Sequence, residues 1–168
     1  SMELSVLETA TNAQIIPNDL VYPSIRQGER LPFMDAGFKP FFEGKERAGE
    51  DYLLACMEGI AFVEFLSYEL LEKYGAFVGK KIFATGGAAS SNLGLQIRAD
   101  ILQKSMHVPA HPHSAMGAAI LAAAGYFNRE VGEVSKEMVS VKRVIEPACS
   151  PSMERLGRLE YFRSCCPL

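Results

Sequence analysis

The segment from Ala84 to Asn92, which reads ATGGAASSN, has the residue types that suit a bound ligand. Its adjacent glycines, Gly86 and Gly87, allow the main chain to bend sharply and keep side chains away from an approaching planar group. The pattern predicts a strand before this bend and a helix after it, whose first N–H groups lack partners within the helix. Glycines at strand-to-helix turns more often serve the connection alone, so the segment by itself is weak evidence of a ligand site.

Two common nucleotide-binding motifs are excluded. The bend does not have the spacing G-x-G-x-x-G, because positions 89 and 91 are alanine and serine, so a Rossmann dinucleotide site is not indicated. Residues 75–81 read GAFVGKK and resemble a P-loop. They have one residue too few between the glycines and lack the serine or threonine that would hold magnesium. We therefore exclude both motifs.

The other chemically able side chains define no site. Three histidines occupy a strand end and a proline-containing loop, without interleaved acidic or thiol ligands, so we interpret them as solvated loop residues: His107, His111 and His113. The four cysteines form no CxxC pair, which is against structural zinc or a secreted disulfide framework. Three helical carboxylates cannot be placed across a cleft, so neither a catalytic base nor a metal ligand is assigned: Glu58, Glu64 and Asp100.

Length and charge restrict the class of protein. The 168 residues suit one compact domain, and 48% hydrophobic residues suit a globular one. A formal charge of −3 gives no reason to expect nucleic-acid or anionic-lipid partners. The longest apolar stretch, near residues 115–127, is shorter than the roughly 20 residues of a membrane-spanning helix. With the cysteines unpaired, we expect a cytoplasmic protein.

The central part of the chain predicts alternating helices and strands. Apolar residues at spacings of three and four predict a helix from Glu50 to Tyr74, buried on more than one side. Strands are then expected at 81–85 and 106–109, and helices at 91–104 and 114–126, which implies a parallel strand pair. The small residues of the last helix, including Gly117, predict close packing against another element. We divide the chain into a loop-rich segment (1–49), an α-β-α-β-α core (50–127) and a C-terminal extension (128–168).

Both ends of the chain carry weaker signals. A short helix is expected from Val6 to Gln14, and an extended piece from Leu20 to Ile25. Residues 139–145 could form a strand. Ser150 is expected to cap a terminal amphipathic helix with Pro151 in its first turn. Four side chains of that helix are predicted to face inward: Met153, Leu156, Leu159 and Phe162.

Six ordered blocks of sequence resemble the C-terminal domain of the FGGY carbohydrate kinases. Together they cover roughly residues 20–126, and their order and spacing carry the resemblance better than any single block. The blocks are GERLP at 28–32, FFEG at 41–44, MEGIAF at 57–62, TGGAAS at 85–90, QIRADIL at 96–102 and SAMGAAILA at 114–122.

The resemblance implies an α/β, ribonuclease H-like (actin-like ATPase) fold and an ATP-dependent kinase acting on a sugar or polyol. In that family the double-glycine turn lies against the adenosine of ATP. Carried over, Gly86, Gly87 and Ala88 would line the adenine pocket, and Ser91 and Asn92 would offer polar contacts. ATP or ADP and a sugar are then the expected partners, with a homo-oligomer possible. Asp100 and Gly117 also match family positions and are interpreted as structural.

The departures from the family pattern are substantial. Family members are about three times this length, and the phosphate loops, most of the sugar pocket and the catalytic aspartate have no counterpart here. Magnesium would be held mainly by that absent part, so the chain alone is expected to be inactive. Pro40, Lys45 and Cys56 replace small or apolar family residues, which leaves the subfamily open. The alternatives are a non-catalytic actin-like module for protein association, through apolar faces of the 50–74 helix, and an unrelated nucleotide-binding α/β domain.

Overall fold

The computed structural model describes residues 14–45 and 47–168, so all but Gln14 of the helix expected at 6–14 lies outside the described residues. The strands are β1 (Leu20–Val21), β2 (Phe42–Glu43), β3 (Lys81–Phe83), β4 (Ser105–Pro109) and β5 (Val141–Ile145). The helices are α2 (Gly49–Lys73), the 3-10 turn η1 (Gly87–Ser90), α3 (Asn92–Leu102), α4 (Ser114–Phe127), α5 (Val131–Met138) and α6 (Met153–Ser164). No described helix combines the length and apolarity that a bilayer span requires.

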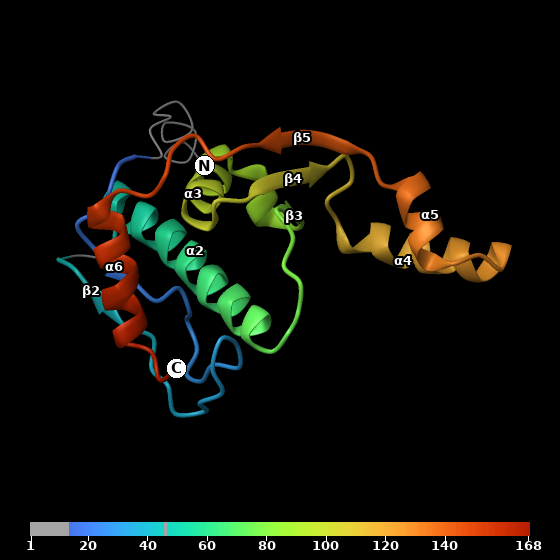
Figure 1. Cartoon of the computed structure of the whole chain (residues 1–168). Helices are drawn as coiled ribbons and strands as arrows, with labels where there is room; N and C mark the ends of the chain where they lie inside the picture. Colours follow the sequence, from blue (N-terminus) through green and yellow to red (C-terminus); the bar gives the residue numbers. More distant parts are fainter. Residues whose placement is uncertain (1–13, 46) are drawn as a thin grey trace.

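Helix α2 runs through the middle of the main body and contacts both α3 and α6 (Figure 1). Its apolar stripe is buried, with Phe62 fully covered, which confirms the long helix predicted from residue spacing. The short β1 lies directly on this helix. A Cβ at Gly59 would be 2.1 Å from the carbonyl oxygen of Val21, so only glycine permits this close approach. The core of the body thus joins α2 to an N-terminal segment that is otherwise mostly loop.

A three-stranded sheet in the order β3-β4-β5 adjoins α3. Strands β3 and β4 are parallel, with Ile82 opposite Met106, and α3 connects them. This confirms the strand-helix-strand unit predicted from sequence. Strand β5 pairs antiparallel with β4, with Ile145 opposite Met106, and so confirms the weaker strand prediction. The parallel pairing with β4 therefore fixes the position of β3, which leads into the double-glycine bend.

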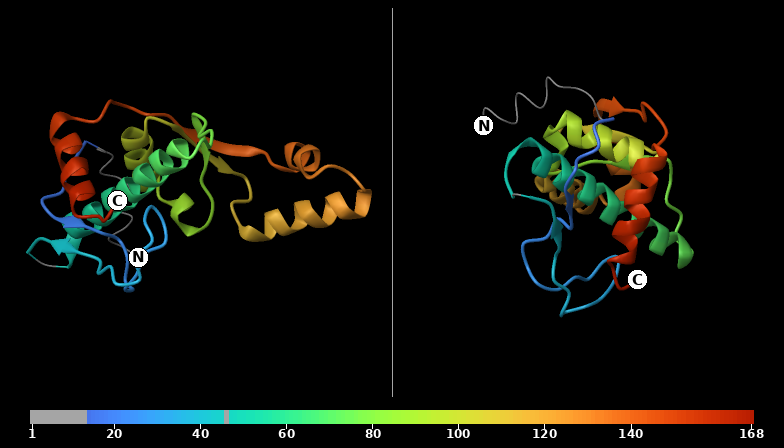
Figure 2. Two further views of the ribbon diagram at one scale, coloured as in Figure 1. Left: turned by 60° about the horizontal axis from the view of Figure 1, so that its bottom comes forward. Right: turned by 90° about the vertical axis from the view of Figure 1, so that its left-hand side faces the viewer.

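Helices α4 and α5 form an arm that projects from the body (Figure 2). The buried cluster of the arm joins Ile120 and Ala124 of α4 to Val134 of α5, a helix that sequence reasoning did not predict. The expected close packing at Gly117 is wrong, because a Cβ there would meet nothing within 4 Å. Small residues remove steric barriers to packing but do not supply a partner, and α4 is exposed over most of its surface.

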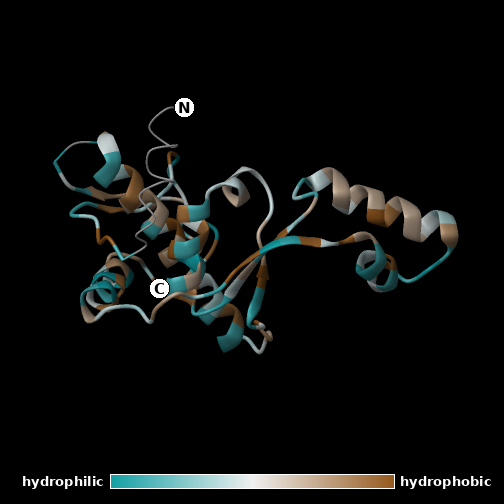
Figure 3. Cartoon of the chain, turned by 90° about the horizontal axis from the view of Figure 1, so that it is seen from above, coloured by the Kyte–Doolittle hydropathy of each residue, from teal (hydrophilic) through white to brown (hydrophobic). Residues whose placement is uncertain are grey.

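Exposed apolar surface lies on α4, which Figure 3 shows as a largely hydrophobic helix away from the body. Its large exposed side chains are Leu121, Tyr126 and Phe127. The association hypothesis placed uncovered apolar surface on α2, but that stripe is mainly covered by α3, α6 and β1. On α2 itself, Ile60 and Leu71 are the large apolar side chains that stay exposed.

Helix α6 packs against α2 with a face that only partly matches the predicted one. It begins at Met153, and Ser152 caps it by accepting a hydrogen bond from the Arg155 main-chain N–H at 3.1 Å, so the expected cap at Ser150 is wrong. Leu159 and Phe162 are buried as predicted, but Met153 is 83% and Leu156 41% exposed. The buried stripe instead includes Arg155, because a carboxylate on α2 pairs with it and offsets the cost of burying charge.

Candidate functional site

The main chain is bare at the bend between β3 and η1. Gly86 has φ of 77° and ψ of −169°, a conformation that favours glycine, and its N–H donates a 2.7 Å hydrogen bond to the carbonyl of Pro112. A Cβ built at Gly86 or at Gly87 would meet nothing within 4 Å. Gly86, Gly87 and Ala88 are all exposed. The bend therefore presents accessible peptide groups that neighbouring side chains do not cover.

Ser91 and Asn92 follow directly and shape the start of α3. The Ser91 hydroxyl oxygen accepts a 3.1 Å hydrogen bond from the Gly94 N–H and caps the helix. The Asn92 side-chain oxygen accepts from the Arg143 guanidinium, which also donates at 2.8 Å to the carbonyl of Ala89. The five predicted site residues thus run from the bend through η1 to the first residue of α3, with the side-chain oxygens of Ser91 and Asn92 already engaged. Arg143 was missed, because nothing local in the sequence connects it to a turn 51 residues away.

A cavity of about 640 Å³ lies beside the bend, within the range typical of small-molecule sites. It lies between the end of the sheet and the α4–α5 arm, and its lining includes Thr85, His111 and His113. Gly86, Gly87 and Ala88 do not line it, but Thr85, which immediately precedes them, does, and the Gly86 N–H bonds to Pro112 between the two lining histidines. The cavity therefore reaches Thr85, the residue directly before the bend.

His111 and His113 line the cavity next to the bend, whereas His107 and the cysteines do not. His107 lies on β4, where its ring nitrogen is 3.0 Å from the Ser105 hydroxyl. Within residues 14–45 and 47–168, no three His, Cys, Asp or Glu side chains are arranged to hold a metal ion. All four cysteines are free thiols, and burial raises the pKa of Cys166 to about 11, which keeps that thiol protonated and unreactive.

The three helical carboxylates considered from sequence are committed to structural contacts. Glu64 pairs with Arg98 at 2.7 Å. The fully buried Asp100 accepts a 2.7 Å hydrogen bond from the Ala148 N–H. Glu58 lies between Arg155 and Arg158, at 3.1 Å and 2.7 Å respectively. None of the three lines the cavity beside the bend, so they hold the helices in place and do not face a reacting group there.

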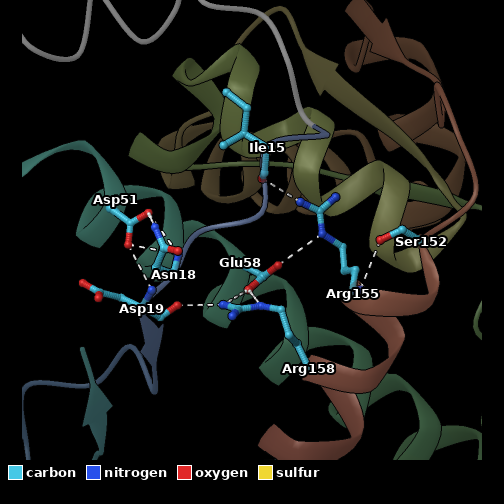
Figure 4. A network of polar contacts seen from close by, with 8 residues as sticks. All are labelled: Ile15, Asn18, Asp19, Asp51, Glu58, Ser152, Arg155 and Arg158. Carbon is cyan, nitrogen blue, oxygen red and sulfur yellow. Dashed lines mark hydrogen bonds and ion pairs between the residues drawn. The ribbon is translucent and has the colours of Figure 1, made fainter. Parts of the chain in front are cut away.

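Figure 4 shows Glu58 with Arg155 and Arg158, and beside this ion-pair network the side chain of Asp51. The guanidinium of Arg158 also donates to the carbonyl of Asp19 at 2.7 Å. Asp51 accepts hydrogen bonds from the main-chain N–H groups of Asn18 and Asp19. Burial raises the pKa of Asp51, but these hydrogen bonds and the charge of Arg158 outweigh it and hold that pKa below its usual value. The network fastens the N-terminal segment to α2 and α6, remote from the bend.

The fold is α/β and is that of the actin-like, ribonuclease H-like ATPase domains. The family model "FGGY family of carbohydrate kinases, C-terminal domain" matches residues 2–126. The chain belongs to this family, which confirms the resemblance seen in the six sequence blocks.

Individual relatives agree with this assignment. The chain is 35% identical over 111 residues to xylulose kinase from Bacillus subtilis, covering 64% of this chain and 22% of that protein. It is 33% identical over 139 residues to glycerol kinase from Geobacter sp., covering 81% of this chain and 27% of that protein.

Solved structures show the same fold. Xylulose kinase from Rhodospirillum rubrum superposes with a TM-score of 0.69 at 24% identity, over 97% of this chain and 33% of that chain. Plasmodium falciparum glycerol kinase with ADP superposes with a TM-score of 0.68 at 15% identity, over 97% of this chain and 32% of that chain. The chain thus spans about a third or less of the proteins it resembles.

Proposed function

We propose that this chain forms the adenosine-binding part of an ATP-dependent kinase that transfers the γ-phosphate of ATP to a hydroxyl of a sugar or polyol. Membership of the FGGY family supports the reaction class, and relatives named xylulose kinase and glycerol kinase support the acceptor class. The observation that carries the adenosine assignment is the exposed, uncovered main chain at Gly86 and Gly87. A planar base can lie flat against such a surface.

Polar contacts to the nucleoside would come from the start of α3. The Ser91 hydroxyl accepts from Gly94 and keeps its own hydrogen to donate, and the Asn92 amide keeps its NH₂ group although its oxygen is engaged. Gly86, Gly87 and Ala88 would supply the flat face. These five residues therefore form a proposed adenosine site with donors on one side of the base.

Phosphoryl transfer needs positioned phosphates, charge stabilisation by magnesium and a group that orients the nucleophile. We propose that these come from parts of a longer protein, with magnesium held mainly there, and that this chain alone does not transfer phosphate. The use of ATP and the four free cysteines fit a cytoplasmic parent protein in this proposal. The same parts of the longer protein would also determine which sugar or polyol accepts the phosphate.

Gly87→Val tests the proposed adenosine site, with ADP binding measured by isothermal titration calorimetry. Gly87 has no positive φ, so valine fits the backbone while its side chain occupies the open face. We expect an affinity for ADP at least about tenfold weaker, because the base loses its contact with the main chain. ATP is expected to respond in the same way.

Gly157→Val is the matched control, since a Cβ at this position on α6 also meets nothing within 4 Å. It is expected to bind ADP as the unmodified chain does. Equal affinity of Gly87→Val and the unmodified chain would place the nucleotide elsewhere. No binding by the unmodified chain at millimolar ADP would contradict the proposed function.

The alternative, a non-catalytic actin-like module for protein association, is favoured by one observation. Leu121, Tyr126 and Phe127 give α4 an exposed apolar face. The same titration separates the two functions, because an association module has no reason to bind ADP or to respond to Gly87→Val.

A further inference from the structure

Helix α3 holds the C-terminal strap, which we define as residues 143–149, along one stripe of polar side chains. The stripe consists of residues 92, 96 and 100, which a spacing of four places on one helix face, and it is continued by Gln103, which ends the helix in the left-handed conformation. Gln96 donates to the carbonyl of Glu146 at 2.9 Å. Asp100 accepts from the Ala148 N–H at 2.7 Å, and Gln103 donates to the carbonyl of Cys149 at 2.9 Å. The strap therefore has a defined register along the whole of α3.

Arg143 forms the end of this register that lies at the bend. One guanidinium nitrogen donates to the Asn92 side-chain oxygen, and the other donates to the carbonyl of Ala89 at 2.8 Å. Ala89 belongs to η1 and Asn92 is the first residue of α3. The rigid fork of an arginine thus bridges the two elements and limits how far one can move against the other.

The backbone of Arg143 is itself held in place. Residue 143 lies in β5 opposite Val108 of β4, so the antiparallel pairing determines where its side chain starts. The side chain is partly buried and reaches the bend from the sheet. A connection from β4 through β5 and Arg143 therefore supports η1 from outside its own stretch of sequence.

We propose that Arg143 is a positioning residue for the nucleotide. By tying Ala89 to Asn92 it fixes the angle between the open peptide face at Gly87 and the donors of Ser91 and Asn92. This inference rests on the proposed adenosine site.

Arg143 lies outside the region matched by the family model, which ends at residue 126. Without Arg143 the bend would move more in the unbound protein, so ADP binding would carry the entropic cost of ordering it, and the affinity for ADP would fall.

The test compares Arg143→Ala, Arg143→Lys and Gln103→Ala by calorimetric ADP titration and thermal unfolding. Gln103 is the matched control because its side chain also donates two hydrogen bonds, to the carbonyls of Asp100 and Cys149, but at the far end of α3. We expect Arg143→Ala to bind ADP about tenfold more weakly. Arg143→Lys should be intermediate, because a lysine has no fork to bridge two acceptors. Gln103→Ala should lose a similar amount of thermal stability and keep its affinity.

Amide hydrogen exchange gives a second readout. In the absence of ADP, Arg143→Ala should raise the rate of amide hydrogen exchange at Ala88 and Ala89. Saturating ADP should suppress that increase. If Arg143→Ala does not fold, Arg143→Lys is tested with the same two measurements. Unchanged ADP affinity in a folded Arg143 variant would overturn the positioning role and leave the adenosine site intact. Equal weakening by Gln103→Ala would also overturn it, since the strap would then act as a whole. No ADP binding by the unmodified chain would overturn both proposals.

Discussion

Glu58→Ala is expected to lower the free energy of unfolding by about 3–5 kcal/mol, because it removes a buried carboxylate that pairs with two arginines, one of them almost fully buried. Glu58 is 1% exposed and pairs with Arg155 at 3.1 Å and with Arg158 at 2.7 Å. Arg155 is also almost fully buried, so solvent cannot replace the lost carboxylate. Urea unfolding followed by circular dichroism measures the change.

Glu69→Ala is the control for this variant. Glu69 pairs with Arg163 at the same distance of 2.7 Å, but both side chains are about one-third or more exposed. Its loss should cost about 0–1 kcal/mol. The double variant Glu58→Leu with Arg155→Leu should recover part of the stability lost in Glu58→Leu alone, because a buried positive charge is then also removed from position 155. Similar costs for Glu58→Ala and Glu69→Ala would show that the Glu58 network is not a buried one.

Phe162→Ala is expected to cost about 3–5 kcal/mol of unfolding free energy, through lost contacts and the cavity left behind. The Phe162 side chain is fully buried, and its ring stacks on Tyr22 with centroids 5.5 Å apart and an angle of 8° between the planes. It also contacts the rings of Phe62 and Phe41, each at 5.3 Å. This one residue therefore joins α6, α2 and the N-terminal loops, and urea unfolding should show its loss clearly.

Met153→Ala is the control on the same helix. Met153 is largely exposed, so the substitution should change stability by less than about 0.5 kcal/mol. Sequence periodicity alone assigned both residues to the inward face of α6, and this pair of variants separates that prediction from the observed packing. A cost for Met153→Ala close to that of Phe162→Ala would support the predicted face and contradict the structure.

Local sequence signals determined the elements that have strong hydrophobic periodicity or clear turn-forming residues at their ends. The 3–4 spacing in α2, the strand-helix-strand unit around α3 and the double glycine after β3 each depend on residues within one or two turns of each other. The sequence also placed the five candidate site residues, Gly86, Gly87, Ala88, Ser91 and Asn92, at the bend and the start of the following helix. The exposed glycine main chain agrees with that expectation, while the adenosine assignment stays a proposal.

The tertiary structure alone decided contacts between residues far apart in sequence. Arg155 turns inward because Glu58 lies opposite it, 97 residues earlier, and this pairing moves Met153 and Leu156 to the surface. Arg143 reaches Asn92 across 51 residues through the pairing of β5 with β4. Side-chain periodicity describes which residues share a face of a helix, but the partner of that face follows from how the elements pack. The sequence therefore located the candidate site, and the packing of distant segments revealed what holds it in shape.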